Sequence, residues 1–116
     1  MGHYHDVQSE LAGPARDLRS RIPDVLSGFA SLHGAAMKDG AISEGVKEVI
    51  ALTLAVAHGC DGCIAAHARG AARKGATPEE VAEGLGVAIL MLGGPGTVYG
   101  PRAWQAYLEF AEKYEQ

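Results

Sequence analysis

The chain has 116 residues, which is enough for one domain with a single hydrophobic core. Hydrophobic residues make up 47% and charged residues 21%, which excludes a disordered chain because the apolar surface offsets the entropy lost on folding. A formal net charge of −4 has the wrong sign for binding nucleic acid or an anionic lipid surface. The longest apolar run, Val49 to Ala57, is too short to span a membrane, and the first residues carry no secretory pattern. We therefore expect a cytoplasmic protein with a single domain over residues 1–116.

In chain order, the apolar spacing and the Gly and Pro residues predict an all-α fold, a compact bundle of about six helices without a sheet. The first eight residues are expected to fray, and a weakly patterned helix follows from about Ser9 to Ser20. Pro23 separates it from a second helix over Asp24 to Asp39, because the residue before a proline avoids helical geometry. The apolar residues of the second helix recur at three- and four-residue steps, which predicts one buried face: Val25, Leu26, Phe29, Leu32 and Ala36.

The third predicted helix begins after Ser43, a favoured N-cap residue, and ends at His58-Gly59. It carries one apolar stripe, and Leu52 and Val56 add apolar surface outside that stripe. In so small a domain, a helix that is apolar nearly all round is expected to be covered in part by a second subunit. The stripe consists of Val46, Val49, Ile50, Thr53, Leu54 and Ala57.

The fourth helix is predicted to open with the cysteine pair at Cys60 and to run to Lys74-Gly75. The fifth covers Pro78 to about Leu92 and has a strong start signal. Thr77 is its N-cap, and Glu80 three residues later completes a capping box.

A last amphipathic helix is predicted to start at about Thr97 or Pro101, after a glycine-rich break. Tyr99 and Trp104 in this segment are interpreted as core aromatic residues rather than as the lining of a pocket. The chain also holds 16 glycines, and small residues of this kind let helices approach closely.

The pattern Cys60-x-x-Cys63-x-x-x-His67 is the feature that carries chemistry. It places one thiol at a helix entrance, a second in the first turn and an imidazole one turn further along the same face. A thiol reacts as its thiolate, and both a helix N-terminus and an adjacent imidazolium favour that form. The three-residue spacing also allows the two sulfurs to form a disulfide. We therefore expect Cys63 to be a reactive thiol.

Two plainer interpretations of the cysteines remain open. An isolated intracellular cysteine is most often a small buried hydrophobic residue. A zinc site is the sharper alternative, because thiolates and imidazoles are good zinc ligands. Cys60, Cys63 and His67 would supply three ligands, and the fourth would have to come from His58, His33 or a carboxylate.

Glu48 on the third helix has small apolar residues as its helical neighbours. A carboxylate in such surroundings is costly to bury unless it is paired or protonated, which makes Glu48 a candidate general base. The alternative is an exposed glutamate paired with Lys47. His33 and the terminal His3 and His5 are interpreted as surface side chains without partners.

The segment from Ser43 to Ala72 closely resembles the core motif of the AhpD-like alkylhydroperoxidases, within the carboxymuconolactone decarboxylase superfamily. The resemblance implies an all-helical fold that assembles into trimers or hexamers. Gly62 stands where some members carry a tyrosine, and His58, which suits a helix C-terminus, stands where members often have asparagine. The matching residues are Glu48, the apolar helix Val49 to Ala57, His58-Gly59-Cys60-Asp61-Gly62-Cys63 and Ile64-Ala65-Ala66-His67.

The residues and the resemblance together predict thiol-based reduction of peroxides, without a metal or an organic cofactor. Glu48 orients or deprotonates His67, and His67 takes the proton of Cys63, whose thiolate attacks the peroxide. Cys60, expected to lie nearer the solvent, then forms a disulfide that a dithiol or a protein reductant reopens. Two alternatives remain: a thiol-disulfide electron carrier for a peroxiredoxin, and a non-redox lactone decarboxylase of the superfamily's founding type.

Overall fold

The computed structural model describes residues 2–114, and every regular element in that range is an α-helix. The predicted all-α class and the six predicted helices are therefore confirmed. The helices are α1 His3–Arg21, α2 Pro23–Met37, α3 Glu44–His58, α4 Asp61–Arg73, α5 Pro78–Leu92 and α6 Gly94–Tyr114.

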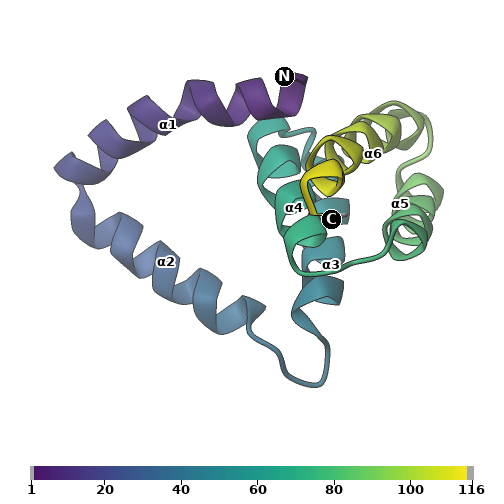
Figure 1. The fold of residues 1–116 in the computed structure, drawn as a ribbon, viewed down its shortest axis with the longest axis horizontal. Helices are drawn as coiled ribbons and strands as arrows, with labels where there is room; N and C mark the ends of the chain where they lie inside the picture. Colours follow the sequence, from purple (N-terminus) through teal and green to yellow (C-terminus); the bar gives the residue numbers. More distant parts are fainter. Residues whose placement is uncertain (1, 115–116) are drawn as a thin grey trace.

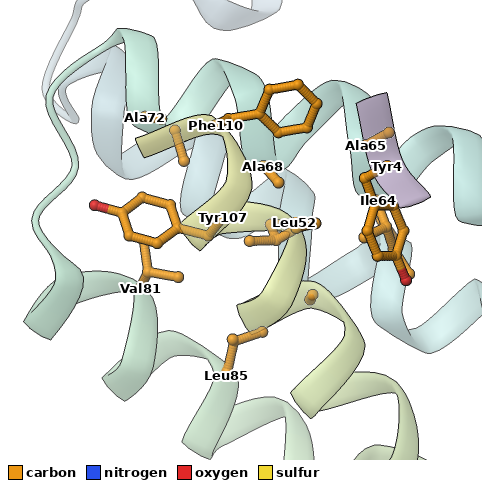
Figure 2. Close-up of a cluster of buried hydrophobic side chains, with 14 of the residues drawn as sticks. Tyr4, Leu52, Ile64, Ala65, Ala68, Ala72, Val81, Leu85, Tyr107 and Phe110 are labelled. Atoms are coloured by element: carbon orange, nitrogen blue, oxygen red, sulfur yellow. The ribbon is translucent and has the colours of Figure 1, made fainter. Parts of the chain in front are cut away.

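Helices α3 to α6 form the body of the molecule, in which α4 packs on both α3 and α6, and α5 packs on α3 and α6 (Figure 1). Leu52, Ile64 and Val81 are fully buried in the core. In Figure 2, Tyr107 of α6 lies beside Val81 and Leu52, whereas Ile64 lies on the side of Tyr4. Many of the remaining core residues are alanines. Small residues bring the helices close together, because a methyl group on Gly84 of α5 would overlap Val49 of α3.

Capping residues set several helix ends as predicted. The Ser43 hydroxyl accepts a hydrogen bond from the backbone of Val46, and Thr77 and Glu80 form the complete capping box. The last helix differs, because it begins at Gly94 rather than near Thr97. Pro95 fits this earlier start, since the first turn of a helix does not use its backbone N–H groups.

We predicted that the first eight residues fray, but in the structure they belong to a helix from His3 onward. Helix α1 begins at His3, and Tyr4 is buried against α4 (Figure 2). Glu109 of α6 holds this end, because its carboxylate accepts hydrogen bonds from the backbone N–H groups of Tyr4 and His5 at 3.1 and 3.4 Å and contacts the His5 ring at 3.2 Å. Burial, with the carboxylate of Asp61 nearby, raises the pKa of Tyr4 above its usual range, so the hydroxyl stays neutral. The contacts of Glu109 come from a residue more than one hundred positions away, which local sequence patterns do not reveal.

Helices α1 and α2 form an arm that leaves the body and returns to it (Figure 1). The predicted buried face of α2 is exposed within one chain, with Phe29 at 62% and Leu32 at 63% exposure. The predicted stripe of α3 is likewise exposed at Ile50 and Leu54, whereas Val49 of that stripe packs against the core. The buried apolar residues of α3 lie outside the stripe, at Leu52, Ala55 and Val56. The apolar patterns were correct as helix patterns, but the body of the same chain leaves much of these faces uncovered.

Within the described residues, no helix combines the length and the apolar character needed to cross a bilayer.

The Glu109 contacts predict that Glu109→Ala destabilises the attachment of α1. Losing a helix cap and leaving polar groups without partners should lower the free energy of unfolding by about 1–2 kcal/mol. Denaturant unfolding and limited proteolysis at residues 3–10 measure this effect. Glu112→Ala, an exposed residue on the same helix, is the matched control. Equal stability and equal protease resistance in the two variants would contradict the assigned role.

Candidate active site

The cysteine pair lies at the junction of α3 and α4. Gly59 ends α3 in the left-handed conformation, with φ of 62°, and turns the chain directly into α4. Cys60 is the N-cap of α4, and its sulfur accepts a hydrogen bond from the backbone N–H of Cys63 at 3.2 Å. The two residues form a disulfide with a Cα–Cα distance of 5.3 Å. Both sulfurs therefore stand at the positive end of the helix dipole, which favours a thiolate.

The exposure of the two cysteines is the reverse of what we predicted. Cys63 is exposed, whereas Cys60 is half-buried in the junction. Cys60 is the N-cap of α4, and its backbone N–H donates to the carbonyl of Ala55 near the end of α3. Cys63, in the first turn of α4, is the more exposed residue of the pair.

Glu48 and His67 meet across the interface between α3 and α4. The Nδ1 atom of His67 lies 3.0 Å from the Oε1 atom of Glu48, and the two side chains are only 24% and 9% exposed. An ionised carboxylate only accepts hydrogen bonds, so with Glu48 in that form Nδ1 of His67 donates to Oε1 and Nε2 is the ring nitrogen left to accept a proton. The alternative of an exposed Glu48 paired with Lys47 is wrong, because Lys47 instead donates hydrogen bonds to the carbonyls of Ala36 and Lys38.

Gly70 makes room for the Glu48 carboxylate. It lies on α4 one turn after His67 and is buried. A methyl group at this position would overlap the Glu48 side chain. Gly70 is a site residue that sequence analysis missed, and its signal was a glycine inside a predicted helix, where glycine is costly without a packing reason.

His67 and Cys63 are one turn apart on α4, as their spacing predicts. In the disulfide form, none of the hydrogen bonds among residues 2–114 joins the His67 ring to either sulfur. The structure thus brings together Glu48 with His67 and Cys60 with Cys63. Helix α4 connects the two pairs, because it carries both Cys63 and His67.

The other histidines have partners, contrary to prediction. His33 of α2 faces His67, with nearly parallel rings whose centroids are 6.3 Å apart. His3 pairs at 3.3 Å with Asp61, a residue that lies between the two cysteines in the sequence. His5 pairs with Glu109. The local sequence around His33 does not predict this contact, because it depends on how helices α1 and α2 leave the body and return to it.

The remaining residues singled out by sequence have mainly structural positions. His58 is the exposed last residue of α3, where a basic side chain complements the helix dipole. A methyl group on Gly62 would lie 3.2 Å from a terminal carbon of Leu11, so α1 covers the place of the family's tyrosine. Tyr99 and Trp104 are half-buried and pack against the core, as interpreted.

Among residues 2–114, no group of three or more His, Cys, Asp or Glu side chains is arranged to hold a metal ion. What the site offers is a disulfide-forming pair at a helix N-terminus and a carboxylate-imidazole pair one turn away. This combination suits proton transfer coupled to thiol chemistry.

The fit of Glu48 against Gly70 predicts that Gly70→Ala displaces the carboxylate. Any thiol chemistry that depends on His67 should fall by about a hundredfold, because general base assistance is worth that much. The free energy of unfolding should fall by about 1–3 kcal/mol through overpacking. Thiol alkylation rates and denaturant unfolding provide the two measurements.

The control is Gly86→Ala on α5, where no atom lies within 4 Å of the added methyl group. This substitution should leave alkylation unchanged and slightly raise stability, because alanine is the better helix former. Wild-type alkylation rates in Gly70→Ala would show that the Glu48 position does not matter.

Comparison with known proteins places the chain in a family. Residues 23–111 match the model of the carboxymuconolactone decarboxylase family. An uncharacterised protein from Cupriavidus necator is 44% identical over 81 residues, 70% of this chain and 72% of that protein. Uncharacterised protein 4 in the cox locus of Paracoccus denitrificans is 35% identical over 99 residues, covering 84% and 89% of the two chains.

A solved structure shows the same fold. The apo crystal structure of a carboxymuconolactone decarboxylase family protein from Legionella pneumophila superposes with a TM-score of 0.90 at 39% identity, covering 93% of this chain and 96% of that one. The resemblance noted in the sequence is thereby confirmed at the level of the family. With its motif, its helices and its relatives in agreement, the chain belongs to the carboxymuconolactone decarboxylase family.

Proposed function

We propose that this protein is a thiol-dependent peroxidase of the alkylhydroperoxidase type. Family membership supports either an AhpD-like or a decarboxylase-type function. The observation that favours the peroxidase is the Glu48–His67 pair, one turn from a cysteine pair that forms a disulfide. A decarboxylase has no use for such a cysteine pair, whereas a peroxidase needs both an activated thiol and a second thiol that resolves the oxidised one.

The reaction begins when Nε2 of His67 takes the proton of Cys63. Glu48 stabilises the resulting imidazolium. The Cys63 thiolate attacks the terminal oxygen of the hydroperoxide, the O–O bond breaks, and the alkoxide leaves as an alcohol after taking a proton from His67. The sulfur is oxidised by two electrons to a sulfenic acid, and the peroxide is reduced by the same two electrons.

Cys60, the half-buried cysteine, resolves the oxidised Cys63. The Cys60 thiol gives up its proton, its sulfur displaces the hydroxyl group of the Cys63 sulfenic acid, and that group takes up the proton and leaves as water, which forms the disulfide seen in the structure. An external dithiol, small or carried by a protein, must then supply two electrons and two protons. Because Cys63 is the exposed sulfur, we assign the attack of this reductant to Cys63. Cys60 leaves as a thiolate that the N–H of Cys63 and the helix N-terminus stabilise.

An electron carrier for a peroxiredoxin is the second candidate function. The exposed position of Cys63 favours it, because a carrier must pass its electrons to another protein through an accessible disulfide. Such a protein would be reduced and oxidised by partner proteins but would consume no peroxide by itself.

We also propose that the protein works as a homo-oligomer, a trimer or hexamer, in the cytoplasm. The exposed apolar faces of α2 and α3 support the assembly, since a single chain leaves Phe29, Leu32 and Leu54 uncovered. The family is often oligomeric.

Peroxide consumption with a dithiol reductant tests the function. Wild type should turn over, Cys63→Ser should be inactive, and Cys60→Ser should react once and hold a sulfenic acid on Cys63 that a dimedone adduct reveals by mass spectrometry. Glu48→Gln should slow turnover by about a hundredfold, and Glu83→Gln, an exposed residue on α5, should not.

Several outcomes would count against the proposal. Absence of peroxide turnover in wild type, with normal exchange between the disulfide and an external dithiol, would favour the carrier. Full activity in Glu48→Gln would leave the redox chemistry standing and remove the proton relay. Metal analysis of the purified protein near one equivalent of zinc would displace the redox function altogether.

A further inference from the structure

A small cavity opens beside the Glu48–His67 pair, between the arm and the body. It has a volume of about 190 Å³, and helices α1, α2, α3 and α4 all contribute to its lining. Besides the pair itself, its polar groups are Gln8, His33, Arg69 and Arg73. The cavity therefore combines the catalytic imidazole with side chains that the reaction above does not use.

The two arginines give this cavity an excess of positive charge. Arg69 and Arg73 lie one turn apart on α4, and neither forms an ion pair with any described residue. The carboxylates nearby are already engaged, because Glu48 contacts His67 and Glu44 pairs with Lys74 at 2.8 Å. In a protein with a net charge of −4, two guanidinium groups beside one cavity form a local positive patch that an anion would complement.

We propose that this cavity binds the carboxylate of a small organic hydroperoxide, so that the substrate of the thiol chemistry is an anion. The proposal rests on the peroxidase function proposed above. Arg69 and Arg73 hold the carboxylate, Gln8 adds an amide donor from α1, and the small side chain of Ala66 leaves room for a short carbon chain. A planar guanidinium matches the two oxygens of a carboxylate and supplies two parallel hydrogen bonds.

The placement of His33 fits the same substrate. Its ring is inclined by only 17° to the ring of His67, and both rings line the cavity. A hydroperoxide bound through its carboxylate lies beside these rings, next to the residue that exchanges protons with Cys63. The cavity volume of about 190 Å³ suits a substrate with a short carbon chain.

Binding of a non-reactive anion tests the site without depending on peroxidase activity. The probes are 3-methylbutanoate and its uncharged amide, 3-methylbutanamide, followed by shifts of the histidine ring resonances in NMR titrations of the disulfide form. The acid should bind about tenfold to a hundredfold more tightly than the amide. Arg69→Gln and Arg73→Gln should each remove most of this preference, whereas Arg19→Gln on the exposed face of α1 should keep it.

Turnover then tests the link to catalysis, with 3-hydroperoxy-3-methylbutanoate and its methyl ester as matched substrates. In wild type, kcat/KM for the acid should exceed that for the ester by about tenfold, and this ratio should approach one in Arg69→Gln and Arg73→Gln. The ester measured in the same variant corrects for a general loss of activity.

The possible failures are distinguishable. Equal binding of acid and amide, or a preference that survives both arginine substitutions, would overturn the anion site. Tighter binding of inorganic phosphate than of 3-methylbutanoate would overturn its assignment to a carboxylate. Selective binding of the acid without turnover of any peroxide would instead retain the site and reject the peroxidase function.

Discussion

The contact between the Glu48 carboxylate and the His67 imidazole constrains the rest of the site. A carboxylate that is 9% exposed needs a hydrogen-bonding partner, because a buried polar group left alone costs about 1–3 kcal/mol or more. The partner is available only if α3 and α4 approach closely, and Gly70 permits that approach. The short turn at Gly59 then fixes where α4 begins and therefore where both sulfurs lie. The close packing at Gly70 and the turn at Gly59 together determine where the Glu48–His67 pair lies relative to the two sulfurs.

The arm formed by α1 and α2 connects this site to the rest of the molecule. Its first residues are held by Glu109, and its path brings Gln8 and His33 to the cavity beside His67. The same arm leaves Phe29 and Leu32 exposed. A second subunit that covers this face would hold α2 in place and thereby keep His33 beside His67. Assembly and the chemistry of the site are linked in this account through one helix (Figure 1).

Sequence patterns predicted what depends on local chemistry and missed what depends on the path of the chain. The helices, the capping box and the cysteines at the start of α4 follow from residues within one or two turns of each other. The apolar stripe of α2 was also recognised, but periodicity cannot say which surface covers a stripe. His33 and Gly70 were missed because their roles arise from contacts between helices distant in sequence. The exposures of Cys60 and Cys63 were also reversed, because sequence spacing alone does not say which of two neighbouring residues the rest of the fold covers.

The most direct test of the central claim is the pH dependence of iodoacetamide alkylation of Cys63, measured in the Cys60→Ser background with and without Glu48→Gln. A carboxylate that stabilises the His67 imidazolium favours the adjacent thiolate. Removing that carboxylate should therefore move the pH of half-maximal alkylation upward, by about one unit if the coupling is worth about 1.4 kcal/mol. Superimposable profiles for the two proteins would mean that Glu48 does not act on the thiol through His67, and the relay on which this account depends would be wrong.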